Sequence, residues 1–390
     1  MHEKTVKAYS ISAAAIAAER QRINDDFSQF DATRVIALDT LELAAMGPRD
    51  VHVRTLAFSL EHNVDHMALA DTVNIVELRG GKLYPGNSAV GEVLAVGPEV
   101  SRFKPGDIVI THCLGEADPF GYTLRIWAYD MPESIGWYAE AFVAGDWQLI
   151  PAPLDCGLNL WEIAALPLRA PTAYLLWRRG HDIFRIKVPR EKLARLNVLG
   201  FGGGVSELFL MLAHHEGHRA FFCSGTTARR EFMEGFGVGT IDQTKFNRFA
   251  TEQDVSAFTK EVKRLTGGSG AHVVCDMLRG PVFPAGLAAL ARQGVSVSAG
   301  WQLGKKVSYD SAAMSVKQIT IDHTHYDTIT GANACTELYG TVFHPTVHDE
   351  IYGFEDLPRA LSEMHRNVQT GIPIVRVARE MPAAVRKLIP

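Results

Sequence analysis

The chain has 390 residues, of which 47% are hydrophobic and 21% are charged. This length predicts about two domains, since a domain usually has roughly 100–200 residues, and the composition is that of a globular protein with a large core. A net charge of −5 argues against a nucleic-acid partner, which usually binds a basic domain. No apolar run reaches the roughly 18 residues of a membrane-spanning helix, so no membrane partner is expected.

The five cysteines are widely spaced and odd in number, which is typical of reduced thiols rather than a disulfide framework. The first residues lack the apolar core and cleavage site of a signal peptide. We therefore expect a cytoplasmic protein.

In chain order, residues 8–30 have the spacing of an amphipathic helix that packs on the body of the protein. Residues 33–150 contain short strands, such as 51–54, 92–96 and 107–111, which are separated by Gly and Pro turns. Short strands separated by such turns predict a compact β-barrel-like domain.

From about residue 160 to 325, helical segments alternate with short apolar runs. Runs without internal alternation suit a parallel sheet that is buried on both faces, so this part predicts a doubly wound α/β domain. The expected strands are 196–199, 220–223, 271–277, 294–299 and 318–321. A later helix (357–370) and strand (373–378) could extend this sheet or return to the first domain.

A glycine-rich turn connects the first of these strands to a helix at 208–214. Glycine permits a tight turn and close approach of the backbone to a pyrophosphate, and the helix N-terminus supplies N–H donors and a positive dipole end. The strand before the turn and the helix after it favour a dinucleotide site over a simple turn. Its expected residues are Gly200, Gly202, Gly203, Gly204 and Val205.

The second strand of the α/β domain should end at the adenosine ribose. An NAD-specific site usually has Asp or Glu there, whereas this chain has Ser224 followed by Arg229 and Arg230. Because guanidinium groups suit bidentate phosphate contact, the sequence predicts NADPH as the cofactor. The alternative is that these arginines lie on a solvated helix face.

A catalytic metal is not expected. His62, His66 and His112 could be ligands, but no Cys lies near His62 or His66, and a four-Cys structural cluster is absent from the sequence. Without a Lewis acid, the substrate must carry its own electron sink. This favours reduction of a C=C bond conjugated to a carbonyl over oxidation of an alcohol.

Several segments resemble the medium-chain dehydrogenase/reductase superfamily: 86–97 (GNSAVGEVLAVG), 103–107 (FKPGD), 164–167 (AALP) and 171–174 (PTAY). Further segments resemble the crotonyl-CoA carboxylase/reductases within it: 111–114 (THCL), 124–127 (LRIW), 343–346 (FHPT), 352–357 (YGFEDL) and 364–367 (MHRN). The resemblance covers roughly residues 35–380. In the glycine turn, Ser206 replaces the family's last Gly, and Gly202 stands where the family usually has Ser.

The resemblance implies an α/β protein with a GroES-like catalytic domain, formed by residues 1–165 and 330–390, and an inserted Rossmann domain at 166–329 that binds NADPH. It implies a homodimer or homotetramer and an enoyl-CoA or carrier-bound enoyl thioester as substrate. The implied chemistry is hydride transfer to Cβ, after which the enolate attacks CO2 at Cα or takes a proton.

The family's carbon dioxide pocket uses an Asn, a Phe–Glu pair and a His. The resemblance places the Asn on Asn63 and the His on His323, whereas the Phe–Glu pair becomes Tyr129 and Asp130. Asp is one methylene shorter than Glu, and a shift of about 1 Å can lower such a rate by two orders of magnitude. These two changed positions therefore bear on carboxylation, whereas hydride transfer does not depend on them. Thr172 is the residue that the resemblance places beside the nicotinamide.

Three alternatives remain at this point. The chain could be a simple enoyl reductase without carboxylation, or a quinone or enone oxidoreductase without a CoA site. A third reading, from another class, is a non-catalytic protein that kept the fold, since fold alone does not fix function.

Overall fold

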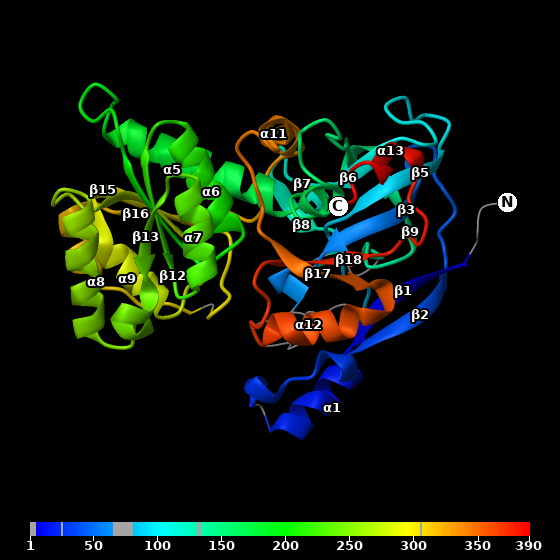
Figure 1. Ribbon diagram of the computed structural model, residues 1–390, viewed down its shortest axis with the longest axis horizontal. Helices are drawn as coiled ribbons and strands as arrows, with labels where there is room; N and C mark the ends of the chain where they lie inside the picture. Colours follow the sequence, from blue (N-terminus) through cyan, green and yellow to red (C-terminus); the bar gives the residue numbers. More distant parts are fainter. Residues whose placement is uncertain (1–4, 25, 65–80, 130, 132–133, 305) are drawn as a thin grey trace. The chain divides into compact units, whose positions relative to one another are not determined.

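The structure is a computed structural model that describes the chain except residues 1–4, 25, 65–80, 130, 132–133 and 305 (Figure 1). The chain is divided into two compact units. Residues 1–168, 328–340 and 347–390 form the first unit, and residues 169–327 and 341–346 form the second. Within the described residues, no helix is both long and apolar enough to cross a membrane.

The first unit is built on a seven-stranded sheet in which β3 (Asp50–Ser59) is the central strand. β3 is almost fully buried, and it pairs antiparallel with β5, β9 and β18. β18 comes from the end of the chain, so the C-terminal segment returns to this sheet. The other strands of the sheet are β5 (Val90–Val96), β6 (Ile108–Thr111), β9 (Ala141–Gly145), β10 (Leu149–Pro151), β17 (Val347–Gly353) and β18 (Ile372–Arg376).

Smaller elements surround this sheet. A three-stranded sheet contains β1 (Thr5–Ser12), β2 (Ile36–Glu42) and β4 (Lys82–Leu83), and β7 (Leu114–Ala117) forms a hairpin with β8 (Thr123–Ile126). The described helices of the unit are α1 (Ala13–Ile23), α4 (Leu160–Ala164), α11 (Ile329–Cys335), α12 (Leu357–His365) and α13 (Ala383–Arg386).

The prediction of one helix over residues 8–30 is wrong. Residues 5–11 form a strand because they pair in register with β2, from Thr5 opposite Glu42 to Ile11 opposite Ile36. The helix begins only at Ala13, where the Ser12 hydroxyl accepts a hydrogen bond from the Ala15 N–H at 3.1 Å. Such a side-chain cap fixes a helix start because it satisfies an otherwise unpaired donor.

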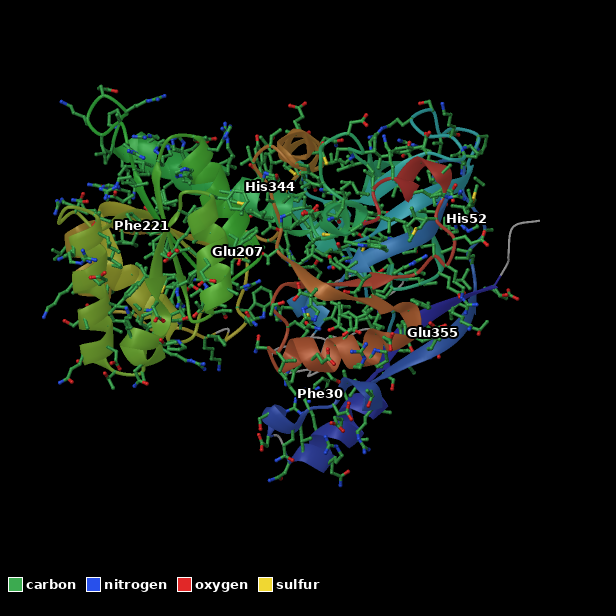
Figure 2. All side chains as sticks on the ribbon, in the orientation of Figure 1. Phe30, His52, Glu207, Phe221, His344 and Glu355 are labelled. Atoms are coloured by element: carbon green, nitrogen blue, oxygen red, sulfur yellow. The ribbon has the colours of Figure 1, made fainter. Side chains whose placement is uncertain are left out.

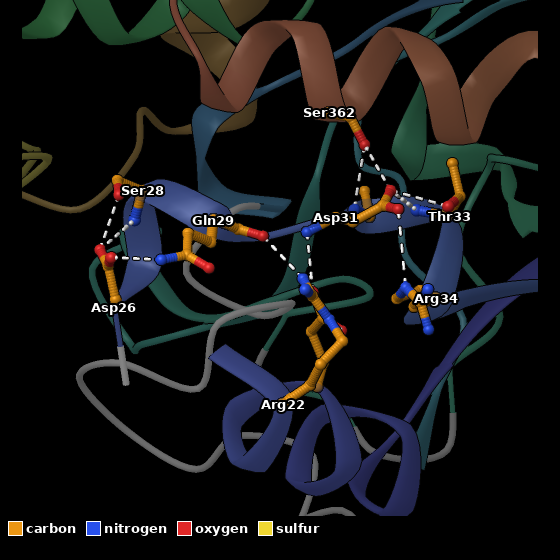
Figure 3. A network of polar contacts seen from close by, with 10 residues as sticks. Arg22, Asp26, Ser28, Gln29, Asp31, Thr33, Arg34 and Ser362 are labelled. Atoms are coloured by element: carbon orange, nitrogen blue, oxygen red, sulfur yellow. Dashed lines mark hydrogen bonds and ion pairs between the residues drawn. The ribbon is translucent and has the colours of Figure 1, made fainter. Parts of the chain in front are cut away.

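The segment after α1 is tied to α12 by polar contacts (Figure 3). The Ser362 hydroxyl accepts from the Ala32 N–H at 3.0 Å and lies 3.3 Å from the Asp31 carboxylate. The Asp31 N–H donates in turn to Glu19, which is paired with Arg22. Residues more than 300 positions apart are thereby joined within the first unit.

The second unit contains six parallel strands in the order β13-β12-β11-β14-β15-β16, with helices between them, which confirms the predicted doubly wound sheet. The strands are β11 (Asn197–Phe201), β12 (Arg219–Ser224), β13 (Gly239–Asp242), β14 (Ala271–Asp276), β15 (Leu290–Ser298) and β16 (Thr320–His323). The helices are α5 (Arg169–Lys187), α6 (Val205–His215), α7 (Thr227–Gly235), α8 (Glu252–Leu265), α9 (Val282–Ala289) and α10 (Ser311–Lys317).

Helices cover both faces of this sheet. A Cβ added to Gly180 of α5 would lie 2.7 Å from Val273, whereas one added to Gly286 of α9 would lie 3.3 Å from Val274. Consecutive residues of a strand point to opposite faces, so α5 and α9 pack on opposite sides of β14. All six residues of β14 are buried, as expected for a strand between two helical layers.

Two buried histidines support the amino end of β11. Nδ1 of His272 accepts from the Asn197 N–H at 2.8 Å, and Nδ1 of His218 accepts from the Leu196 N–H at 3.2 Å. Burial lowers the pKa of each imidazole from 6.5 to about 4. Each nitrogen that accepts a backbone N–H must keep its lone pair, so both side chains are neutral in the folded protein.

These histidines predict a loss of stability in mild acid. The unfolded chain binds their protons near pH 6.5 and the folded chain only near pH 4, so their contribution is complete above pH 6.5 and falls as the pH drops towards 4. Thermal unfolding measured from pH 7.5 to 4 should show this decline, and His272→Asn should make it shallower. A wild-type curve that is flat across this range would contradict the assignment.

Candidate functional site

The glycine turn lies at the carboxyl end of β11 and leads into α6. Gly202 has a φ of +94° and Gly204 a φ of +48°, values that side chains rarely adopt. Gly204 is the N-cap of α6 and supplies no side-chain cap, so the N-terminus of this helix faces the turn with backbone donors. Gly200 lies within β11, where a Cβ would stand 2.9 Å from Leu210 and hold α6 away from the sheet.

Ser206 takes the place of a packing glycine at the start of α6. Its side chain is fully buried, and its hydroxyl donates to the Phe201 carbonyl at 2.6 Å. The hydroxyl also lies 3.6 Å from Sγ of Cys275. A serine is compatible with this close approach of helix and sheet because its polar atom is hydrogen bonded.

A buried acid and two arginines surround the turn, and sequence reasoning missed the acid and one arginine. Oε1 of Glu207 (labelled in Figure 2) lies 3.3 Å from Nε of Arg229, at ion-pair distance. Burial raises the pKa of Glu207, while Arg229, the Gly204 backbone and Arg169 oppose that rise. A Cβ on Gly203 would collide with the guanidinium of Arg229, and one on Gly204 would lie 3.1 Å from Nε of Arg169.

Arg230 takes a different position from Arg229. Its Nη1 donates to the Ser224 carbonyl at the end of β12 at 2.8 Å and lies 3.5 Å from Asp242. Its Nη2 donates to the Thr227 hydroxyl at 3.1 Å. The two predicted phosphate ligands therefore separate: Arg229 lies at the glycine turn, and Arg230 lies at the end of the second strand.

This arrangement fits a phosphorylated dinucleotide. The turn carries net positive charge, because it has two guanidinium groups and an uncapped helix N-terminus but only one buried carboxylate. A pyrophosphate would be held there. The end of β12 offers Ser224 and Arg230, and residues 224–230 include no acid. Thr172 is buried on α5, one turn after Arg169.

His323 lies at the carboxyl end of β16, in register with Ser298 of β15. Nη2 of Arg279, a residue that follows β14, lies 2.8 Å from Nδ1 of His323. Burial lowers the pKa of His323, and Arg279 lowers it further. The ends of β14 and β16 thus bring His323 beside Arg279, a cation that was not predicted from the sequence.

The other predicted catalytic residues belong to the first unit. Asn63 follows β3, and its Oδ1 is buried without a hydrogen-bond partner in the described part of the chain. Tyr129 is buried, and its N–H donates to the Ile126 carbonyl at 3.2 Å. Asp130 lies outside the described residues.

Among the described residues, no three His, Cys, Asp or Glu side chains come together as metal ligands. His112 is fully buried, and desolvation lowers its pKa to about 3. His66 lies outside the described residues. The absence of a catalytic metal remains a prediction.

Comparisons with known proteins agree with this architecture. Residues 47–154 match the alcohol dehydrogenase GroES-like domain family, and residues 204–338 match the zinc-binding dehydrogenase family. The chain is a medium-chain dehydrogenase/reductase. This assignment confirms the predicted superfamily and the predicted pairing of a GroES-like domain with a Rossmann sheet, and it places the chain among oxidoreductases.

Within this superfamily, the chain is similar to two curated enzymes. A crotonyl-CoA reductase of Streptomyces avermitilis is 26% identical over 379 residues, covering 87% of this chain and 82% of the relative. A crotonyl-CoA carboxylase/reductase of Cereibacter sphaeroides is 24% identical over 364 residues, covering 86% of this chain and 81% of the relative.

The fold is also similar to a solved structure of a 2-octenoyl-CoA carboxylase reductase in complex with NADP and 2-octenoyl-CoA. The TM-score is 0.81 at 20% identity, and the likeness covers 100% of this chain and 91% of that chain.

A methyl group added at Gly203 should lower the stability of this dehydrogenase/reductase, whereas a methyl group added at the nearby Gly225 should not. Gly203→Ala would move Arg229 away from Glu207, leave a buried carboxylate without its cation, and cost about 1–3 kcal/mol of stability. Gly225→Ala is the matched control, because its Cβ would meet only Thr244 at 3.6 Å. Thermal unfolding of both variants checks this, and an equal melting temperature for the two would contradict it.

Proposed function

We propose that this protein reduces the C=C bond of a 2-enoyl thioester with NADPH and carboxylates the resulting enolate with CO2. The observation that carries the proposal is the similarity of 87% of the chain to a crotonyl-CoA reductase. A solved structure with the same fold contains NADP and 2-octenoyl-CoA. The substrate is an enoyl-CoA or a carrier-bound enoyl thioester, and we keep a homodimer or homotetramer as the expected assembly.

The cofactor's phosphates would be held in two places. The pyrophosphate would lie at Gly202, Gly203, Gly204 and Val205, where Arg169 and Arg229 supply positive charge. The 2′-phosphate would lie at Ser224 and Arg230, where the ion pair with Asp242 keeps the guanidinium beside the strand end. When bound, NADPH supplies the hydride that is added to Cβ.

The chain's own residues would then orient the substrate. His323 and Asn63 are the groups that we assign to CO2 or to the thioester oxygen, and Thr172 is assigned to the nicotinamide carboxamide. The buried and unpaired Oδ1 of Asn63 supports a ligand contact there, because an unpaired buried polar atom is costly. The reaction proposed here needs no metal, since the thioester carbonyl accepts the charge of the enolate.

Simple reduction without carboxylation is the second candidate. It is favoured by Tyr129 and Asp130, which replace the Phe–Glu pair of the carboxylases. The hydroxyl of Tyr129 adds an oxygen in a buried position, and the shorter Asp130 would move any water that it holds. Neither change affects hydride transfer, so both candidates share the same cofactor site.

The two arginines predict different cofactor phenotypes. Arg230→Gln should raise the KM for NADPH about 10- to 100-fold with little change for NADH, because a charge-assisted contact to the 2′-phosphate is lost and Asp242 remains. Arg229→Gln should weaken both cofactors to a similar extent, because the pyrophosphate is common to them. Steady-state kinetics with each cofactor test this. If Arg230→Gln affects both cofactors equally, the 2′-phosphate binds elsewhere.

Product masses test the reaction itself. With NADPH, a short 2-enoyl-CoA and bicarbonate, the protein should form a carboxylated acyl-CoA, and without bicarbonate only the saturated product. Asn63→Ala should lower the ratio of carboxylated to saturated product. Saturated product alone in bicarbonate would establish the simple reductase. Turnover of quinones or free enones but not of the thioester would overturn the proposal, as would a failure to bind NADPH.

A further inference from the structure

His323 has a fixed cation as its hydrogen-bond partner. Nη2 of Arg279 lies 2.8 Å from one ring nitrogen of His323 and 3.4 Å from the other. A guanidinium has five N–H donors, no acceptor, and a pKa too high for deprotonation in a protein. The ring nitrogen that faces Arg279 must therefore accept, whichever of the two nitrogens it is.

Arg279 is held rigidly in this position. It is 3% exposed, and its backbone lies in the left-handed region at a φ of +62°. Oδ1 of Asp276 accepts from the N–H groups of Leu278 and Arg279, each at 2.9 Å, which stabilises this backbone. The guanidinium also stacks over the ring of Phe283 at 4.7 Å. A strained backbone held by its surroundings often marks a functional position.

Among the described residues, the guanidinium of Arg279 makes side-chain hydrogen bonds to His323 alone. Its Nη1 is buried without a partner, and Oδ2 of Asp276 is likewise unpaired, among the residues that the structure describes. Asp276 thus holds the backbone of Arg279 and Phe283 packs against its guanidinium, while the hydrogen bonds of the guanidinium go to the imidazole. Although His323 is partly buried, it is exposed enough that its ring remains accessible to solvent.

We propose that Arg279 is a positioning residue that keeps His323 as a neutral imidazole, with its single proton on the ring nitrogen turned away from Arg279. In this state, His323 presents one N–H donor to a ligand and cannot start a reaction as an imidazolium acid.

The surrounding charges agree with this proposal. The neighbouring acid on β16, Asp322, would favour a charged imidazole, but Arg179 of α5 binds it through two hydrogen bonds of 2.6 Å. Burial and Arg279 both lower the pKa of His323, against the opposing effect of Asp322. Asp276 is the other acid near Arg279, and its unpaired oxygen partly offsets the positive charge.

The role of the His323 N–H in catalysis rests on the proposed function, whereas its protonation state does not. If CO2 is the electrophile, the outward N–H of His323 would donate to the carboxylate oxygen that forms, and Arg279 behind the ring would strengthen that donor through its positive charge. The proton that quenches an enolate in simple reduction would have to come from another group or from water. The protonation state of His323 itself can be measured without turnover.

The experiment is a long-range proton–nitrogen NMR titration of the full chain with labelled histidine, with His323→Gln used to assign the ring signals. In the wild type, we expect one protonated and one unprotonated nitrogen, and titration below pH 6.5. Arg279→Gln should raise the midpoint and mix the tautomers, Arg279→Lys should restore the single tautomer, and the matched exposed variant Arg292→Gln should change neither.

A wild-type His323 that titrates at or above pH 6.5, or that populates both tautomers equally, overturns the proposal, and this measurement needs no variant to fold. Unchanged His323 signals in a folded Arg279→Gln protein overturn it as well. The ratio of carboxylated to saturated product in His323→Gln tests the proposed function separately. A single neutral tautomer with an unchanged product ratio would support the role of Arg279 while removing His323 from CO2 capture.

Discussion

The parallel pairing of six strands is the constraint on which the second unit depends. Because every strand runs in the same direction, their carboxyl ends meet at one edge of the sheet, where ligands of open α/β sheets bind. The glycine turn after β11, Ser224 at the end of β12, Arg279 after β14 and His323 at the end of β16 all reach this edge. Residues separated by more than 120 positions in the sequence thereby reach the same edge of the sheet.

Buried acids and arginines of opposite charge lie close together at this edge of the sheet. Glu207 and Asp276 are buried acids whose pKa values burial raises, and each lies near an arginine. Removing a charge from water is costly unless it is paired, so these acids and arginines require one another. Glu207 lies at ion-pair distance from the guanidinium of Arg229, whereas Asp276 fixes the backbone of Arg279 through hydrogen bonds.

The sequence predicted the second unit well because its signals are local. Apolar runs without alternation and a glycine turn between strand and helix depend on neighbouring residues alone, and they located all of its predicted strands to within a few residues. Residues 8–30 were assigned wrongly because their apolar spacing suits a helix, while the strand in Thr5–Ser12 depends on pairing with β2, about 30 residues away.

The site was predicted less completely for the same reason. Glycines and arginines could be recognised from their position after strands, but the sequence could not show that Arg229 lies at Gly203 while Arg230 lies at Ser224. Glu207 and Arg279 were missed, because an acid in a first helical turn and an arginine in a loop are common on protein surfaces. Their burial is a property of tertiary packing, and only a three-dimensional structure shows it.

The position of β18 has a consequence for how the chain folds during synthesis. This strand comes from the last 20 residues, yet it lies between β3 and β17 within the sheet of the first unit. The second unit is nearly contiguous, and its whole parallel sheet has left the ribosome before β18 is made. We therefore expect the inserted unit to fold first, while β3, although translated early, waits with an open edge for a partner from the C-terminus.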